Sequence, residues 1–312
     1  MDAHTRLIIL YGPVSQKLHE KQQRQISGET TCMYRSMAEK FGEIIYLAKQ
    51  DCKEPWEKDF SHFGYHLSRV ADYINSQYGV VVWSVKHDKT GKKDNLLQCI
   101  QQYKVYYSCC SYNQTNKYCN ISLVDTPGRV KGNAILWVKG KDPNFWKPKT
   151  TLKLVDYVFL GRRGDKNEVY FINRLTKEIR AERSILWIGG AKHQNKIKST
   201  HHKVICTPVK QPEDIVNLMS TCRVGLILSE IPAEGFPQSF LEMTMMGLPV
   251  VYMGPVNNVY TNNCFKLEDK KKCVEAAEHV LTRPNGWQTR KYAIEHYTLD
   301  KSYESILKGL YA

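Results

Sequence analysis

The chain has 312 residues, enough for two domains of ordinary size that each bury a core. Its hydrophobic content of 42% and charged content of 24% are those of a soluble globular protein, and no apolar run approaches the roughly 18 residues that span a bilayer. Residues 1–12 lack the pattern of a secretory signal, and the ten cysteines show no CxxC spacing typical of a zinc or redox site. We therefore expect a cytoplasmic protein with reduced thiols.

The formal charge of +14 is spread evenly along the chain. Residues 1–148 hold 21 basic and 14 acidic residues, and residues 149–312 hold 24 and 17. Such an excess favours anionic partners such as nucleotides or phospholipid head groups, although a solvated basic surface explains it equally well. A nucleic-acid-binding protein would gather Lys and Arg with aromatic residues on one surface. We therefore expect no nucleic acid as a partner and leave peripheral contact with an anionic membrane open.

Strands and helices alternate along the first half of the chain. Short apolar runs predict strands at residues 7–11, 43–48, 80–85 and 105–109. Amphipathic spacing predicts helices on Met33, Met37 and Phe41, on Leu67, Val70, Ala71 and Ile74, and over residues 95–102. This alternation is typical of a parallel sheet with helices on both faces.

The stretch GKDPNFWKPK at residues 140–149 is rich in Gly, Pro and Lys and suits an interdomain linker. After it, strands are predicted at residues 157–160, 185–188, 204–206, 224–228 and 249–252. Helices are predicted on Val169, Ile172, Thr176 and Ile179, on Ile215, Leu218, Met219 and Cys222, and on Tyr303, Ile306, Leu307 and Leu310. The second half therefore repeats the pattern of the first.

The predicted fold is α/β, with two doubly wound, Rossmann-like domains that face each other across a cleft. We place the first domain at residues 1–147 and the second at residues 148–295. We expect the C-terminal helix, residues 296–312, to pack back on the first domain. Ligands of such sheets bind beyond the carboxyl ends of the strands.

The stretch AEGFPQSFLEMTMMGLPVVYMG, residues 233–254, places polar chemistry at such a strand end. Glu234 follows the predicted strand at residues 224–228. Pro237 suits the first turn of a helix, where its missing N–H costs nothing, and Gly247 suits the C-terminal cap. The sequence therefore predicts a helix whose start lies at the ligand-binding edge of the sheet.

The amides near Gln238, Ser239 and Phe240 then lie at the positive end of that helix, which is an arrangement that binds phosphate. Glu242 is one turn further on and Glu234 precedes the turn, so both carboxylates can accept hydrogen bonds from hydroxyls. A phosphate with hydroxyl groups on both sides is the pattern of a nucleotide sugar.

The sequence EGFPQSFLE followed by GLPVV resembles the signature of family-4 retaining glycosyltransferases with the GT-B fold. That signature is a Glu, seven residues, a second Glu and a Gly-x-Pro-Val-Val strand. Three further segments resemble the family in the same order: residues 144–148, residues 159–162 with Lys166, and residues 224–229. The resemblance covers residues 140–254 well and residues 1–139 weakly.

The resemblance implies roles for individual residues. Arg162 and Lys166 would neutralise the donor diphosphate together with the amides of the helix start, without a metal ion and without any cofactor other than the nucleotide-sugar substrate. Glu242 would hold the ribose and Glu234 the transferred sugar. The remaining implied site residues are Gly235 and Phe236 in the donor-binding turn and His87, which resembles the histidine that the family places near the donor sugar.

The resemblance implies a retaining hexosyltransferase that uses GDP-mannose or UDP-glucose, with a glycan or glycoconjugate as acceptor. The first domain departs from the family pattern, because the glycine-rich loop after its first strand is reduced to Gly12-Pro13 and fewer strands than usual are predicted. This compactness resembles glycosyltransferases of large algal viruses, for which the location would be the host cytoplasm. A homodimer and an association with the membrane stay open.

Three other functions compete with this interpretation. A nucleotide-sugar epimerase shares the architecture but needs acid–base carboxylates in both domains, and no such pair is evident. A basic nucleic-acid-binding protein conflicts with the even distribution of charge. An inactive sugar-binding protein is disfavoured because Glu234, Glu242, Arg162 and Lys166 are all present.

Overall fold

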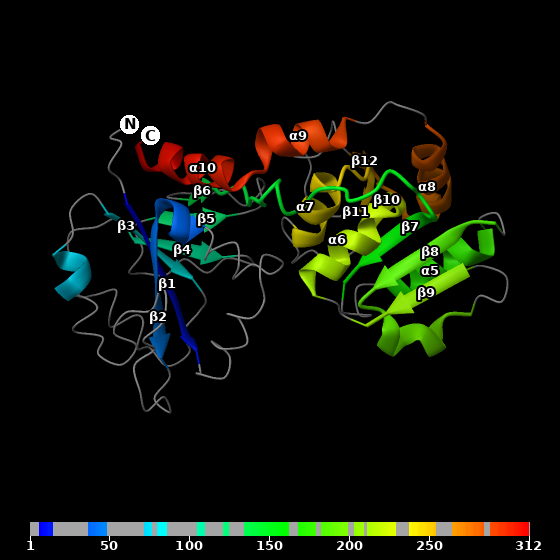
Figure 1. The fold of residues 1–312 in the computed structure, drawn as a ribbon, viewed down its shortest axis with the longest axis horizontal. Helices are drawn as coiled ribbons and strands as arrows, with labels where there is room; N and C mark the ends of the chain where they lie inside the picture. Colours follow the sequence, from blue (N-terminus) through cyan, green and yellow to red (C-terminus); the bar gives the residue numbers. More distant parts are fainter. Residues whose placement is uncertain are drawn as a thin grey trace. The chain divides into compact units, whose positions relative to one another are not determined.

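We describe the protein from a computed structural model, shown in Figure 1. The described residues are 6–14, 37–48, 72–76, 80–85, 105–109, 121–124, 134–161, 168–178, 182–198, 203–208, 211–228, 237–253, 264–283 and 288–311. By their internal contacts the residues form two compact units. The first unit comprises Met1–Trp137 with Tyr303–Ala312, and the second comprises Val138–Ser302.

The first unit contains a six-stranded sheet in which every pair of neighbouring strands is parallel. The strands in chain order are β1 (Arg6–Val14), β2 (Gly42–Ala48), β3 (Val80–Val85), β4 (Val105–Cys109), β5 (Ile121–Val124) and β6 (Ala134–Leu136). Their order across the sheet is β2-β1-β3-β4-β5-β6. The four strands predicted from apolar runs are confirmed, and β5 and β6 were not predicted.

Strand β1 runs through Gly12-Pro13, where the sequence predicts a turn. Its pairing with β2 shifts register between Tyr11 and Val14, so three steps on β1 correspond to two on β2. Pro13 has no N–H to donate to a ladder, and an extra residue in one strand is the usual way to absorb such a position. The strand therefore continues through the Gly-Pro pair with a shift in register.

The core of the first unit forms around β1, whose residues Leu7 to Leu10 are all fully buried. A continuous apolar run, without alternation, is what a parallel strand covered on both faces requires. Met37 and Ala38 of the helical residues 37–41 are also fully buried. Near the end of the chain Tyr303 stacks on Phe41, with ring centroids 3.9 Å apart.

The second unit contains another parallel six-stranded sheet. Its strands are β7 (Val155–Leu160), β8 (Ser184–Ile188), β9 (Lys203–Thr207), β10 (Cys222–Leu228), β11 (Val250–Met253) and β12 (Cys264–Lys266). They lie in the order β12-β11-β10-β7-β8-β9. Five of the six were predicted, and the three-residue strand β12 was not.

Four of the six helices described in the second half were predicted, with shifted ends, and the two over residues 273–282 and 289–296 were not. The six helices are α5 (Glu168–Glu178), α6 (Pro212–Ser220), α7 (Gln238–Met245), α8 (Cys273–Thr282), α9 (Thr289–His296) and α10 (Leu299–Tyr311). Cys222 was assigned to the helix before β10, but α6 ends at Ser220 and Cys222 is the first residue of the strand. None of the described helices has both the length and the apolar character needed to cross a bilayer.

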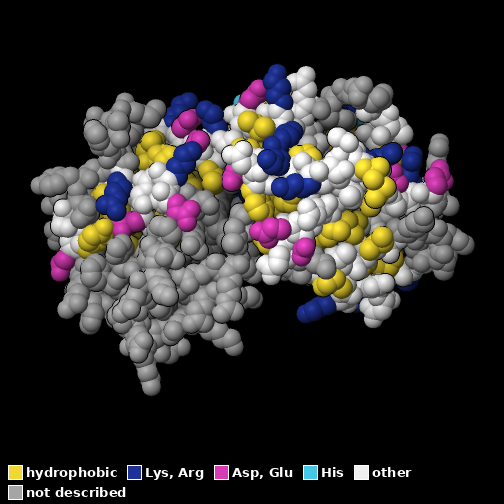
Figure 2. All heavy atoms as spheres, in the orientation of Figure 1, with side chains coloured by type: hydrophobic (Ala, Val, Ile, Leu, Met, Phe, Trp, Pro, Cys, Tyr) yellow, Lys and Arg dark blue, Asp and Glu magenta, His cyan; other side chains and the backbone are white. Residues whose placement is uncertain are grey.

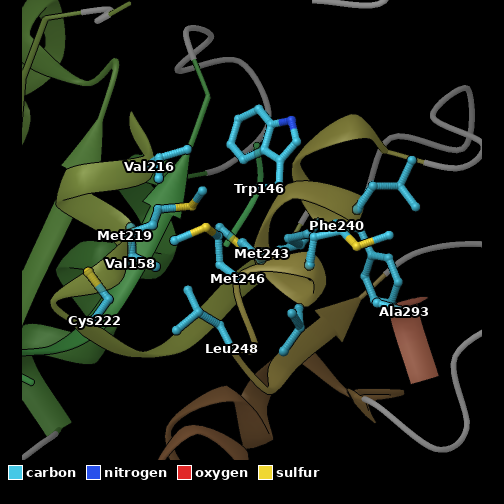
Figure 3. Close-up of a cluster of buried hydrophobic side chains, with 14 of the residues drawn as sticks. Trp146, Val158, Val216, Met219, Cys222, Phe240, Met243, Met246, Leu248 and Ala293 are labelled. Carbon is cyan, nitrogen blue, oxygen red and sulfur yellow. The ribbon is translucent and has the colours of Figure 1, made fainter. Parts of the chain in front are cut away.

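Two buried clusters of side chains sandwich the second sheet. One joins α6, α7 and α9 with Trp146, and the other joins α5 and α8. Figure 3 shows the first of these, with Phe240 and Met243 of α7 in the same cluster as Val158 of β7 and Met219 of α6. Helix α7 is therefore part of the core and holds a fixed place above the sheet.

Candidate functional site

The strand order of the second unit contains a point where the winding reverses. From β7 the chain proceeds to β8 and β9 on one side, and from β10 it proceeds to β11 and β12 on the other. Strands β7 and β10 are neighbours, with Leu226 opposite Phe159. In doubly wound sheets ligands bind at the carboxyl ends of the two strands that flank this switch point. The site is therefore expected beyond Leu160 and Leu228.

The carboxyl end of β7 is held in place by its neighbour β8. The amide of Gly161 donates to Ile188 O at 3.0 Å, and Gly161 O accepts from the Trp187 indole at 3.2 Å. The Trp187 ring packs so closely on Gly190 that a Cβ there would lie 2.1 Å from a ring carbon. The residue before Arg162 thus has a fixed position, whereas Arg162 and Lys166 themselves lie outside the described residues.

Helix α7 begins where the sequence predicts it, after the carboxyl end of β10. Pro237 is the residue before the first helical position, with φ −66° and ψ 136°. The Phe240 amide donates to Pro237 O at 3.1 Å, and the Phe240 side chain is fully buried. Within the described part of the chain, the amides of Gln238 and Ser239 have no acceptor. These two amides are the ones available to a ligand at the helix start.

The end of α7 also agrees with the prediction. Gly247 adopts the left-handed conformation, with φ 77°. Its amide donates to Thr244 O at 3.0 Å, and the amide of Leu248 donates to Met243 O at 3.0 Å. This pair of bonds is the Schellman motif, so Gly247 caps the helix as predicted.

Gly225 brings α7 close to the sheet. A Cβ at Gly225 in β10 would lie 2.6 Å from Met243 Sδ and 3.2 Å from Val250 Cγ2. The missing side chain lets Met243 fill the space over β10. A glycine in a strand interior commonly marks such a close approach.

Gln238 has an unusual environment at the start of α7. Both Oε1 and Nε2 of its side chain are buried, and neither has a hydrogen-bond partner within the described residues. A buried amide without partners costs about 1–3 kcal/mol, so native proteins generally supply one. Gln238 therefore marks a place where a polar ligand would be stabilised.

Glu242 lies one turn after Gln238, on the same face of α7. It is only 6% exposed, and its Oε1 accepts from Lys141 Nζ at 2.7 Å. Lys141 is itself buried, with a side chain 2% exposed, and its ammonium group lies 5.2 Å from the centre of the Trp146 ring. The carboxylate is therefore held in a buried ion pair at a fixed orientation.

Lys141 was not predicted as a site residue. The sequence shows it only as one of several lysines in the 140–149 stretch, 101 positions before its partner. The backbone explains its place: its amide donates to Tyr297 O at 2.8 Å, and it forms a parallel bridge with Thr298. Gly140 permits this approach, since a Cβ there would lie 2.3 Å from Thr298 O.

Arg290 of α9 fastens the same stretch to the end of α7. Its guanidinium donates to Pro143 O at 2.9 Å, to Trp146 O at 2.6 Å and to Met245 O. Burial lowers the pKa of Arg290 from its ordinary value. Residues 141–146 and α7 are therefore a single hydrogen-bonded assembly around Glu242.

The structure thus describes four of the predicted site residues, all on α7: Gln238, Ser239, Phe240 and Glu242. The others, which lie outside the described residues, are His87, Arg162, Lys166, Glu234, Gly235 and Phe236. Across the described ranges, no group of three or more His, Cys, Asp or Glu residues could hold a metal ion. Metal independence stays a prediction.

Residues 155–283 match the model of a family described as "Glycosyl transferases group 1". Among solved structures, a glycosyltransferase from Rickettsia africae superposes with a TM-score of 0.65 at 13% identity, over 98% of this chain and 97% of that one. A trehalose-6-phosphate synthase from Burkholderia multivorans superposes with a TM-score of 0.64 at 8% identity, over 98% of both chains. The fold is that of the GT-B glycosyltransferases.

A third GT-B structure is an α-glucosyltransferase in complex with UDP and a 13-mer DNA, with a TM-score of 0.63 at 11% identity over 98% of this chain and 99% of that one. No curated protein sequence matches the chain. At these identities the likeness concerns the fold, and it confirms the predicted α/β architecture of GT-B type. The group 1 match lies within the second unit and is in keeping with the coarser part of the predicted family.

Proposed function

We propose that this protein is a retaining, metal-independent glycosyltransferase that transfers a hexose from a nucleotide sugar to a glycan or glycoconjugate. One observation carries the proposal. Helix α7 begins after β10, one of the two strands that flank the switch point. Its first turn presents the amides of Gln238 and Ser239 and the buried Gln238 side chain, which has no hydrogen-bond partner within the described residues. Glu242 lies one turn further along the same helix. The group 1 match of residues 155–283 supports a transferase built on this unit.

The donor diphosphate would bind at the start of α7. The amides of Gln238 and Ser239 and the positive end of the helix favour negative charge there. Phe240 contributes through packing, because its own amide donates to Pro237 O. Arg162 and Lys166 follow the anchored Gly161 in the sequence, and we assign them to the charge that develops on the leaving diphosphate.

The ribose would bind at Glu242. An ionised carboxylate only accepts hydrogen bonds, and the ribose hydroxyls can donate them. The ion pair with Lys141 fixes the orientation of this buried carboxylate before the donor arrives. We assign Glu234, which follows β10 in the sequence, to the hydroxyls of the transferred sugar, and His87 to the donor sugar.

The transfer itself needs little covalent chemistry from the protein. The bond between the anomeric carbon and the leaving phosphate oxygen breaks while an acceptor hydroxyl bonds to the same carbon from the same face. The proton of that hydroxyl passes to the leaving phosphate oxygen, so charge and atoms balance. In this scheme Arg162 and Lys166 stabilise the diphosphate as its charge grows.

The donor follows from the family resemblance as GDP-mannose or UDP-glucose. The UDP in the α-glucosyltransferase structure makes uridine diphosphate the first ligand to test. That structure also contains DNA, whereas the even charge of the present chain favours a carbohydrate acceptor. Duplex DNA should therefore not stimulate donor turnover.

Calorimetric titration tests this function directly. UDP, GDP, UDP-glucose and GDP-mannose are titrated into the protein in the presence of EDTA. We expect one nucleotide series to bind with micromolar affinity, and Gln238→Ala to weaken the diphosphate by about 1–3 kcal/mol because it removes the buried amide. Binding that requires added magnesium or manganese would contradict metal independence. Conversion of the bound sugar to its epimer without acceptor would indicate an epimerase.

A further inference from the structure

A groove of about 590 Å³ opens at the amino-terminal edge of the second sheet. Its walls come from the residues before β7, the start of β10, Pro249 before β11 and the last turn of α8. The proposed donor site lies beyond the carboxyl ends of the same parallel strands. The groove is therefore at the opposite edge of the sheet, and the proposed function makes no use of it.

Three cationic side chains line the groove: Lys153, Arg223 and Arg283. Lys153 Nζ donates to Ser220 O at 2.8 Å, which holds its charge at the wall, and burial lowers its pKa. Arg223 is half exposed, and its guanidinium lies 3.8 Å from Asp156 Oδ1, beyond normal hydrogen-bond length. Asp156 also accepts from the amide and hydroxyl of Ser184. The groove is consequently electropositive.

Two leucines stand beside these cations. Leu152 is 60% exposed and Leu154 is 64% exposed, the two largest values for big hydrophobic residues within the described ranges. Leu152 lines the groove together with Lys153, and Leu154 directly follows Lys153 in the sequence. The Leu152 amide donates to Thr150 Oγ1 and the Leu154 amide to Thr221 O, which fixes the backbone that presents them.

The segment that leads to the leucines adds further charge. Lys147 and Lys149 precede them and are both exposed. The surface defined by residues 147–154 with Arg223 and Arg283, here called the amino-edge surface, thus combines exposed aliphatic side chains with five cations. Cations beside protruding apolar side chains match a partner that presents anionic groups directly above an apolar layer.

We propose that the amino-edge surface docks the protein on an anionic lipid bilayer. Lipid phosphates would occupy the groove between Arg223 and Arg283, while Leu152 and Leu154 enter the boundary between head groups and acyl chains. An acidic protein segment could neutralise the cations, but it would have to supply a separate apolar socket for both leucines. The net charge of +14, spread over the chain, also favours an extended negative surface over a small acidic patch.

Vesicle co-sedimentation tests this docking. The full chain is mixed with vesicles of phosphatidylcholine alone, or with vesicles that also contain about 30% phosphatidylglycerol and therefore have a negative surface. We expect binding to the anionic vesicles only. Leu152→Ser/Leu154→Ser should weaken it about tenfold or more, because it removes the apolar anchor. Arg223→Gln/Arg283→Gln should weaken it about fivefold per arginine at low salt.

Matched variants elsewhere on the same unit control for general effects. Ile205→Ser/Ile294→Ser removes two exposed aliphatic side chains, and Lys192→Gln/Lys196→Gln removes two exposed cations. Both should bind as the unmodified protein does. Equal loss in test and control variants, unchanged binding of the leucine variant, or failure of the unmodified protein to bind anionic vesicles would each overturn the proposal.

Hydrogen exchange of the unmodified protein gives a second test that depends on no variant. Anionic vesicles should slow exchange of amides in residues 147–154 and leave residues 191–198 unchanged. Slowing that appears with inorganic phosphate alone, at the same phosphate concentration, would identify a phosphate site without membrane docking and overturn the proposal. Because the amino-edge surface lies at the opposite edge of the sheet from the proposed donor site, a protein that does not bind vesicles could still bind UDP.

Discussion

At the scale of single residues, the arrangement around Glu242 shows how a predicted site residue depends on an unpredicted one. The EGFPQSFLE motif points to Glu242, but its charge is balanced by Lys141 from a stretch that reads only as a linker. A lysine so far away in sequence gives no local signal, because its side chain is placed by the backbone bridge to Thr298. The motif could therefore be predicted, but the pair could not.

Lys141→Met should destabilise the protein by about 3–5 kcal/mol, because it breaks a buried ion pair by removing the cation from beside Glu242. Urea unfolding measures the loss, and Lys147→Met, which changes an exposed lysine in the same stretch, is the control. The double variant Lys141→Met/Glu242→Leu should recover much of the stability yet fail to bind UDP. Full UDP affinity in the double variant would show that Glu242 has no part in binding.

The two glutamates of the motif should differ in their effects on binding. Glu242→Ala should weaken UDP and the intact donor by similar factors, because the ribose is present in both. Glu234→Ala should leave UDP affinity almost unchanged but reduce sugar transfer, since its hydroxyl partners exist only in the donor. Calorimetry with UDP, followed by turnover measurements, separates the two. Similar loss of UDP affinity in both variants would refute this division.

The buried thiols should be unreactive in the native protein. Burial raises the pKa of Cys222 to about 12 and that of Cys273 to about 11, from an ordinary value of 9.0. Their contribution to stability is fully present below pH 9 and is lost as the pH rises toward 11–12. Mass spectrometry after maleimide treatment at pH 7.5 should find both unmodified in buffer and both modified in urea. Rapid modification in buffer would contradict this.

At the scale of elements, the helices and strands that could be predicted are those long enough to show a recognisable hydrophobic pattern. Strands β3 and β10 have six and seven residues, most of them apolar, and α7 is bounded by Pro237 and Gly247. Strands β6 and β12 have three residues each, which is too short for periodicity to show. They are edge strands of their sheets, where pairing with one neighbour is the main determinant.

Two glycines around α7 should respond differently to substitution. Gly225→Val should destabilise by about 1–3 kcal/mol through overpacking against Met243 and should also weaken UDP, because it displaces the helix start. Gly247→Ala should cost about 1–2 kcal/mol from its left-handed backbone without changing UDP affinity in the folded protein. Thermal unfolding and calorimetry on both variants decide this. Weaker UDP binding by Gly247→Ala together with unchanged binding by Gly225→Val would contradict both expectations.

At the scale of the whole molecule, the chain crosses from the first unit to the second and returns. Tyr303–Ala312 belong by their contacts to the first unit, where Ile306 is fully buried and a Cβ on Gly309 would lie 2.4 Å from the Ile135 side chain. On the surface, Figure 2 shows Lys and Arg side chains among acidic and hydrophobic ones on the visible face, in keeping with the even charge of the sequence. The last turns of α10 are therefore structural residues of a unit whose strands end more than 160 residues earlier.

Ile306→Ala should destabilise the first unit by about 2–5 kcal/mol, because it leaves a cavity in that core. Hydrogen exchange followed by mass spectrometry should show faster exchange in β1 and β3 and unchanged exchange in β7 and β8. Asp300→Ala, at an exposed position of the same helix, is the control. Faster exchange restricted to β7 and β8 would show that α10 supports the other unit.

The return of α10 to the first unit has a consequence during protein synthesis. A ribosome that adds about 5–20 residues per second needs roughly ten to thirty seconds to proceed from β6 to Ile306 of α10. Throughout this interval the sheet of the first unit lacks Tyr303 and Ile306, which complete its core. The second unit, Val138–Ser302, is continuous in sequence and has no such delay. The unit translated first is therefore the unit completed last, and the nascent chain exposes part of its core until α10 has been synthesised.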